Sequence, residues 1–224
     1  MKKAIAILLS LTMILGLAAC GNSASQTEQP STEDTSVESK ADTNSAENST
    51  DMENTDNQDV QGHKVLVAYF SATGTTKGVA EHIANGLNAD IYEIVPEDPY
   101  TDADLNYNDN NSRTTIEMND PNARPAISGS VENMEQYDII FVGYPIWWGE
   151  APRIVSTFME SYDFSGKTIV PFCTSGGSGI GSSASNLERL TSGATWLDGR
   201  RLNGSDSQDT VMEWVDSLDL NLAE

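Results

Sequence analysis

Four hydroxyl side chains that separate an apolar run from a helical pattern are the first residues in this sequence that could bind a ligand. The stretch SATGTT contains Ser71, Thr73, Gly74, Thr75 and Thr76. Free backbone N–H groups and the helix dipole both favour an anion at the start of a helix. The stretch has no Lys or Arg, so neutral donors would hold a phosphate there. The alternative is that the hydroxyls only cap the helix.

A second turn carries two adjacent tryptophans after another apolar run. It contains Pro145, Ile146, Trp147, Trp148 and Gly149. Indole rings are large flat surfaces for stacking, and two neighbours in an extended turn cannot both face the same way. We therefore expect at least one of them to face a ligand, although paired tryptophans are also common as core or surface residues.

A third turn is rich in glycine, which lets the backbone approach a ligand closely. It contains Thr174, Ser175, Gly176, Gly177 and Gly179. A phosphate joined to a broad aromatic ring would satisfy all three turns, and flavin mononucleotide (FMN) has both parts.

These turns need a scaffold that brings them together. Strand-like runs alternate with helical patterns, which predicts an α/β fold: a doubly wound, open parallel sheet with helices on both faces. Ligands bind such sheets at the carboxyl ends of the strands, where each of the three turns is expected. The predicted strands are 65–70, 89–95, 139–144, 168–174 and a short fifth near 194–197; the predicted helices begin near 75, 112, 153, 184 and 207.

The three turns resemble the flavin loops of flavodoxins. Residues 71–76 match the S/T-x-T-G-x-T phosphate loop, and residues 144–149 and 174–179 are similar to the second and third loops. The resemblance covers about 64–218. It implies a five-stranded sheet in the flavodoxin order 2-1-3-4-5, non-covalent FMN and one-electron transfer. The hydroxyl turn would bind phosphate, the tryptophan turn would line the isoalloxazine, and the glycine turn would contact its pyrimidine end.

One departure from flavodoxins concerns the outer face of the flavin. Many flavodoxins cover it with a Tyr of the third loop, but residues 174–181 contain no aromatic residue. That face is either open or covered by Tyr107 from the long polar segment 99–130. The Pro-Ile-Trp-Trp-Gly turn is also similar to that of flavin-dependent quinone reductases.

Three functions therefore stay open. The first is an electron carrier; it is favoured because the sequence predicts no second domain that would bind a nicotinamide. The second is an FMN-dependent NAD(P)H:quinone-type reductase, and the third is a non-redox binding module. The partners would be a redox protein or a small-molecule electron donor or acceptor.

The N-terminal region predicts export and a membrane anchor. Lys2 and Lys3 precede an apolar run, and Cys20 follows Leu-Ala-Ala. This pattern is typical of a secretory signal peptide, residues 1–19, and resembles the lipobox of bacterial lipoproteins, which implies a lipid on Cys20. Residues 20–62 form an acidic, Ser/Thr-rich segment that predicts a disordered tether. The domain, residues 63–224, would face the outside of the cytoplasm.

Charge and residue types exclude further classes of partner. The domain has 24 Asp and Glu against 9 Lys and Arg, so nucleic acid is not an expected partner. No Cys/His cluster has metal-ligand spacing, so no metal is expected. Cys173, within an apolar run, is expected to be a buried hydrophobic residue, and Arg113 and Arg124 are expected to form local ion pairs.

Overall fold

The structure, a computed structural model, describes residues 63–220 and 222. The predicted signal peptide, the predicted lipidation site Cys20 and the predicted tether lie outside the described residues. None of the helices in the described ranges combines the length and the apolar character that crossing a membrane requires.

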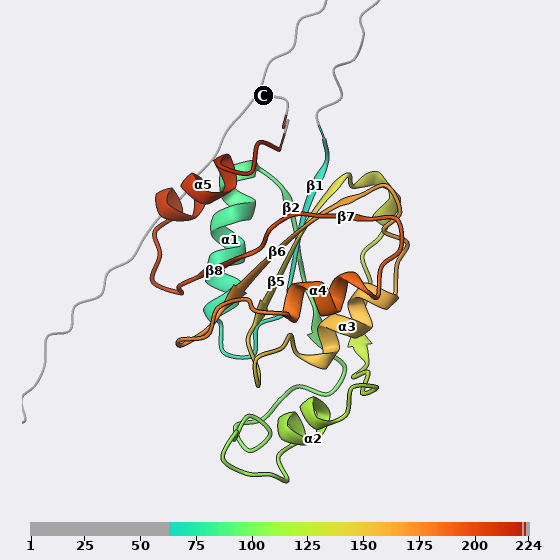
Figure 1. Ribbon diagram of the computed structural model, residues 1–224, viewed down its shortest axis with the longest axis vertical. Coiled ribbons are helices and arrows are strands. Elements are labelled where there is room, and N and C mark those ends of the chain that lie inside the picture. The colour runs from blue at the N-terminus through green and yellow to red at the C-terminus, as the bar shows by residue number, and fades with distance from the viewer. Residues whose placement is uncertain (1–62, 221, 223–224) are drawn as a thin grey trace, which may run out of the picture. The chain divides into compact units, whose positions relative to one another are not determined.

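A parallel sheet forms the centre of the domain (Figure 1). Its order is β2-β1-β5-β6-β7, and β8 also pairs with β6. Since β7 and β8 are two pieces of one edge strand, the sheet has the predicted order 2-1-3-4-5. The bounds are β1 Val65–Tyr69, β2 Asp90–Glu93, β5 Ile139–Pro145, β6 Thr168–Thr174, β7 Thr195–Trp196 and β8 Arg200–Leu202.

The break in the edge strand coincides with Pro171 of β6. The Ile169 carbonyl accepts a hydrogen bond from Leu197 N at 2.9 Å. In a parallel ladder alternate residues face the same neighbour, so the Pro171 nitrogen faces the edge strand too. Proline has no N–H to donate to the edge strand. Accordingly, β7 pairs with β6 before Pro171 and β8 pairs with β6 after it. A Cβ on Gly199 would lie 2.7 Å from the Pro171 oxygen, so only glycine fits the crossing.

Two helices cover one face of the sheet, α1 (Thr75–Leu87) and α5 (Gln208–Asp216). Val67 of β1 points to this face and is buried with Ile83 of α1 and Trp214 of α5. Alternate residues of a strand face opposite sides, which is why the β1 run is apolar throughout: it is buried on both faces.

The opposite face is covered by α3 (Arg153–Glu160) and α4 (Ser183–Glu188). Ala68 of β1 packs in this core with Phe158 of α3 and Leu187 of α4. Helices on both faces confirm the predicted doubly wound architecture.

The long polar segment after β2 is ordered by local structure. A short antiparallel pair of strands, β3 (Val95–Pro96) and β4 (Ile127–Ser128), joins its two ends. Helix α2 (Arg113–Asn119) confirms the predicted short helix, and the Ser112 side chain caps it by accepting a hydrogen bond from a backbone N–H. Figure 1 shows α2 at the end of the domain toward which the parallel strands run. A 3₁₀ turn, Met134–Gln136, precedes β5.

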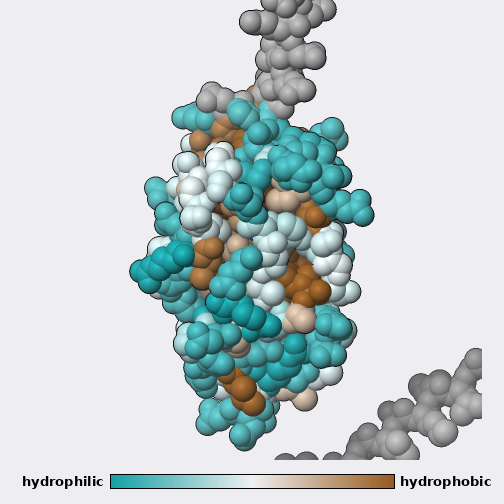
Figure 2. Space-filling model, turned by 90° about the vertical axis from the view of Figure 1, so that its right-hand side faces the viewer, coloured by the Kyte–Doolittle hydropathy of each residue, from teal (hydrophilic) through white to brown (hydrophobic). Residues whose placement is uncertain are grey.

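Figure 2 shows one face of the domain, on which hydrophilic residues predominate and hydrophobic ones form small separate patches. This agrees with the acidic composition of the domain.

Candidate functional site

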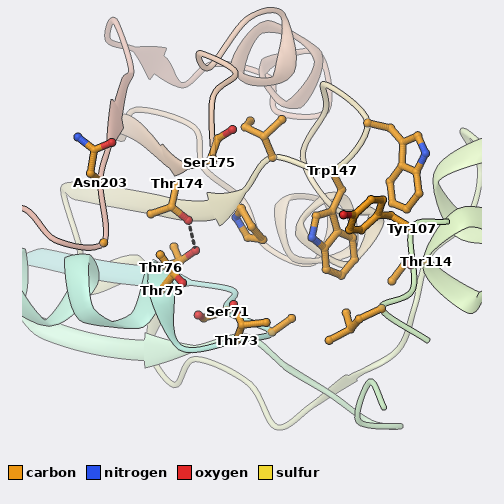
Figure 3. Close-up of a pocket in the computed structure, with 17 residues that line it drawn as sticks. Ser71, Thr73, Thr75, Thr76, Tyr107, Thr114, Trp147, Thr174, Ser175 and Asn203 are labelled. Carbon is orange, nitrogen blue, oxygen red and sulfur yellow. Dashed lines mark hydrogen bonds between the residues drawn. The ribbon is translucent and has the colours of Figure 1, made fainter. Parts of the chain in front are cut away.

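A pocket of about 660 Å³ lies where the three predicted turns meet (Figure 3). This volume is within the range of about 300–1,000 Å³ that is usual for small-molecule sites. Eleven predicted site residues line the pocket: Ser71, Thr73, Thr75, Thr76, Pro145, Ile146, Trp147, Trp148, Thr174, Ser175 and Gly176. Four predicted glycines do not line it: Gly74, Gly149, Gly177 and Gly179.

Hydroxyls of the first and third turns line the polar end of the pocket. The Ser71 Oγ is buried and has no hydrogen-bond partner among the described residues. The Thr76 and Thr174 hydroxyls bond to each other at 2.8 Å, which ties the first turn to the third. Gly74, at φ +83°, is the N-cap of α1, and no side chain of the described residues caps that helix. The hydroxyls are therefore not helix caps, which argues against the alternative reading of this turn.

The tryptophan turn is a tight reversal at the other end of the pocket. Trp147 and Glu150 exchange two backbone hydrogen bonds of 2.9 Å. Trp148 and Gly149 lie between them at φ +49° and +82°, as in a type I′ turn. The Glu150 carboxylate accepts a hydrogen bond of 2.8 Å from Asn186 of α4, which anchors the far side of the turn.

The two tryptophans have different surroundings, as two neighbours in a turn should. Trp147 is partly buried, with its ring 5.5 Å from Phe70 and 5.4 Å from Tyr100 in edge contacts. Trp148 is 45% exposed at the tip of the turn. Both line the pocket, so the site has one fixed and one exposed indole.

The pocket thus has two chemically distinct ends. Hydroxyls from the first and third turns gather at one end, and the Trp147 and Tyr107 rings lie at the other (Figure 3). An elongated ligand with an anionic tail and a flat apolar head matches this division.

Five residues from outside the three turns also line the pocket. Leu105, Tyr107 and Thr114 come from the segment before and within α2, and Asn203 and Gly204 follow β8. Of these five, the sequence points only to Tyr107, as one alternative for covering the flavin; Tyr107 lines the pocket and is 73% exposed.

The turn after β8 packs closely on the first turn. A Cβ on Gly204 would lie 2.5 Å from the Thr75 Cγ2 atom. No local sequence signal marks Asn203 or Gly204, because only the parallel pairing of β8 with β6 brings them to this edge.

Both arginines of the long segment form ion pairs: the Arg113 pair is local, as predicted, whereas Arg124 pairs with a residue of α3. Arg113 pairs with Glu117 and Arg124 with Glu160, each with a closest distance of 2.7 Å. Hydrogen bonding to Arg124 lowers the pKa of Glu160. Neither arginine lines the pocket.

Cys173 is fully buried in β6, which confirms its prediction as a small hydrophobic residue. Burial raises the pKa of its thiol to about 11, so the neutral form prevails near pH 7.

Comparison with known proteins agrees with this geometry. A family model described as flavodoxin matches residues 64–218. A protein from Bacteroides eggerthii described as a flavoprotein is 49% identical over 69% of this chain and 97% of that one, with a TM-score of 0.66. One from Bacteroides uniformis, also described as a flavoprotein, is 46% identical over 70% and 99%, with a TM-score of 0.66.

A more distant structure shows the fold alone. The Lactobacillus acidophilus flavoprotein, solved in complex with FMN, is 22% identical over 70% of this chain and 98% of that one, with a TM-score of 0.53. A search of curated proteins gave no match. Because the flavodoxin model spans well over half of the sequence, this protein belongs to the flavodoxin family.

Proposed function

We propose that this protein binds FMN non-covalently in the pocket at the carboxyl edge of the sheet and transfers electrons. The observation that carries this proposal is the division of the pocket: hydroxyls of the first and third turns line one end, including Ser71, which has no partner among the described residues, and aromatic rings line the other. A buried polar group without a partner is uncommon and costs free energy unless a ligand satisfies it. FMN is the cofactor that membership of the flavodoxin family implies.

The first turn would hold the phosphate. Hydroxyl donors from Ser71, Thr73, Thr75 and Thr76 surround that end of the pocket, and the N-terminus of α1 adds its dipole. No Lys or Arg lines this pocket among the described residues, so the phosphate would keep its charge without a side-chain counterion.

The second turn would hold the flavin ring. Bound FMN supplies the redox chemistry, whereas the protein positions the ring and sets its electrostatic surroundings. Trp147 and Ile146 would exclude water from the flavin ring, and Trp148, at the tip of the turn, would cover it. The strongly acidic domain disfavours additional negative charge on the ring and should lower its reduction potential.

Titration of the purified protein with FMN tests the binding site. Trp147→Ala and Trp148→Ala should each weaken binding by about 1–3 kcal/mol if flavin stacking resembles base stacking. Trp196→Phe is the control, because Trp196 lies in β7 outside the pocket. Unchanged affinity in both alanine variants would remove the stacking role.

We further propose that the domain works outside the cytoplasm, held to the membrane by lipid on Cys20. The support is the Lys2–Lys3 start, the apolar run and the Leu-Ala-Ala-Cys sequence. Several acyl chains would be needed for a stable anchor. In cell fractionation, Cys20→Ser should move the protein from the membrane to the soluble fraction; if the variant stays with the membrane, the anchor lies elsewhere.

Electron carrier and reductase differ in one assay. A carrier should not sustain NAD(P)H oxidation when FMN and a quinone are the only additions. Steady NAD(P)H oxidation by the FMN-loaded protein would assign it to the reductases instead.

A further inference from the structure

Trp147 is held by two aromatic rings that do not line the pocket. The rings of Phe70 and Tyr100 stand nearly perpendicular to it, at 90° and 86°. Phe70 and Tyr100 also contact each other, with ring centroids 5.8 Å apart. Phe70 is fixed at the end of β1 in the core, so Tyr100 is the member of this trio that depends on the long segment for its position.

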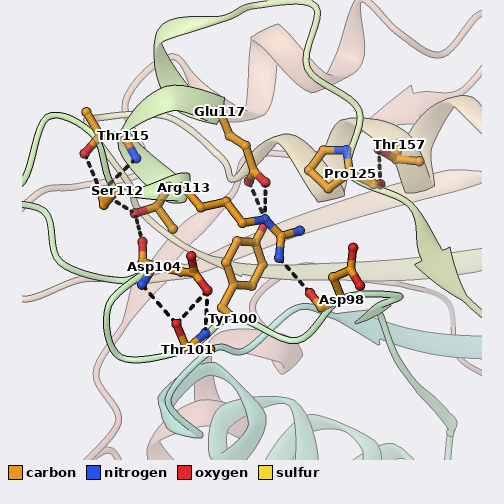
Figure 4. A network of polar contacts seen from close by, with 11 residues as sticks. Asp98, Tyr100, Thr101, Asp104, Ser112, Arg113, Thr115, Glu117, Pro125 and Thr157 are labelled. Atoms are coloured by element: carbon orange, nitrogen blue, oxygen red, sulfur yellow. Dashed lines mark hydrogen bonds and ion pairs between the residues drawn. The ribbon is translucent and has the colours of Figure 1, made fainter.

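Two side chains of α2 fix Tyr100 (Figure 4). The Tyr100 hydroxyl donates a hydrogen bond of 2.6 Å to Glu117 Oε2. The Arg113 guanidinium lies 4.2 Å from the centroid of the Tyr100 ring, a cation–π distance. Arg113 Nε also donates to the other oxygen of Glu117 at 2.7 Å. The Arg113–Glu117 ion pair therefore contacts Tyr100 at two places, the face of the ring and the hydroxyl.

Helix α2 is in turn fixed at both ends. Arg113 Nη1 donates to the Asp98 carbonyl at 2.7 Å, two residues before Tyr100. Arg153, at the start of α3, donates to the Met118 carbonyl at 2.9 Å. These contacts form a closed series. The tryptophan turn contacts Tyr100, Tyr100 contacts α2, and α2 contacts α3, which follows the tryptophan turn directly in the chain.

We propose that Tyr100 is a positioning residue for the flavin site. Arg113 and Glu117 hold Tyr100 in place, and Tyr100 holds Trp147 in the orientation that contacts the ligand. This inference rests on the proposed FMN site. An indole that is already ordered does not lose its rotational freedom on binding, so preorganisation strengthens affinity without a new contact to the ligand. The assignment also gives the long segment a role: α2 supports the back of the aromatic wall.

The test compares two arginines of the same segment in the full-length protein. Arg113→Gln removes the cation over Tyr100 and leaves the Glu117 carboxylate without its positive partner. We expect FMN to bind about 3–10-fold more weakly, the factor equivalent to one cation–π or aromatic contact. The visible circular dichroism of bound FMN should also change, because it reports the orientation of the neighbouring ring. Tyr100→Phe, which keeps the ring and loses only the hydroxyl, should show a smaller change in the same direction.

Arg124→Gln is the matched control. It breaks an ion pair of the same length but touches neither Tyr100 nor Trp147. It should leave the FMN affinity and the circular dichroism unchanged. An equal effect of both arginine variants would overturn the proposal, because it would show general loosening of the segment.

A double-mutant cycle tests whether Arg113 and Tyr100 act through Trp147. In a Trp147→Leu background, Arg113→Gln should weaken FMN binding by less than about twofold. A full effect in that background would overturn the proposal. If wild-type protein binds FMN and Arg113→Gln binds it equally well, the inference fails alone; if wild-type protein does not bind FMN, the proposed function fails.

Discussion

Replacement of Ser71 by alanine should separate stability from binding, because its hydroxyl is buried without a partner among the described residues. Most serine-to-alanine changes at buried sites remove a hydrogen bond and destabilise the protein. This one removes an unsatisfied group. The variant should therefore fold at least as well as the wild type and bind FMN less tightly.

The structure sets the size of both effects. An unpaired buried hydroxyl costs about 1–3 kcal/mol, so the free energy of unfolding of FMN-free protein should rise by at most that amount. A hydrogen bond to a charged group such as phosphate contributes about 1.5–3 kcal/mol. Its loss should raise the dissociation constant of FMN by about 10–150-fold.

Urea unfolding of FMN-free protein and fluorescence titration with FMN measure the two quantities. Ser175→Ala is the contrasting variant, because Ser175 Oγ already accepts hydrogen bonds from Gly177 N and Ser178 N. That variant should lower the stability of the FMN-free protein. If Ser71→Ala destabilises FMN-free protein by more than about 1 kcal/mol, or leaves FMN affinity unchanged, the phosphate role of Ser71 is refuted.

Three further outcomes follow from the fold. Gly199→Ala should destabilise the domain by about 1–3 kcal/mol in urea unfolding, since its Cβ would overlap Pro171. Hydrogen bonds from Tyr137 and Lys64 lower the pKa of Asp90. Its stabilising contribution is therefore present above its unfolded pKa of about 4 and is lost as the pH falls through the lower folded value; Asp90→Asn should flatten the acid limb of a pH–stability curve. Cys173 in the native protein should resist iodoacetamide at pH 7.5 and react after denaturation, as read by peptide mass mapping.

The sequence predicted the strands and the pocket turns best, because local residue chemistry and the order of the elements are enough to place them. Runs such as VLVAY predict a strand buried on both faces, and the hydroxyl, tryptophan and glycine turns each follow such a run. The carboxyl ends of parallel strands share one edge, so the meeting of Ser71, Trp147 and Thr174 in one pocket followed from the topology.

The rest depends on long-range packing. Asn203 and Gly204 reach the pocket only because the edge strand restarts after the gap at Pro171. Leu105 and Thr114 reach it because α2 folds back over the strand ends, a position fixed by Arg113, Arg153 and their carbonyl partners. Their spacing in the sequence carries no period or motif from which this contact could be predicted.

Stepwise anaerobic reduction of the protein loaded with FMN, followed by visible absorbance, tests the central claim most directly. The account predicts one FMN per chain and a separate one-electron-reduced form at the midpoint of the titration. Passage directly to the two-electron-reduced form would contradict the electron carrier and favour a reductase. Failure to bind FMN at all would contradict the whole account of the pocket.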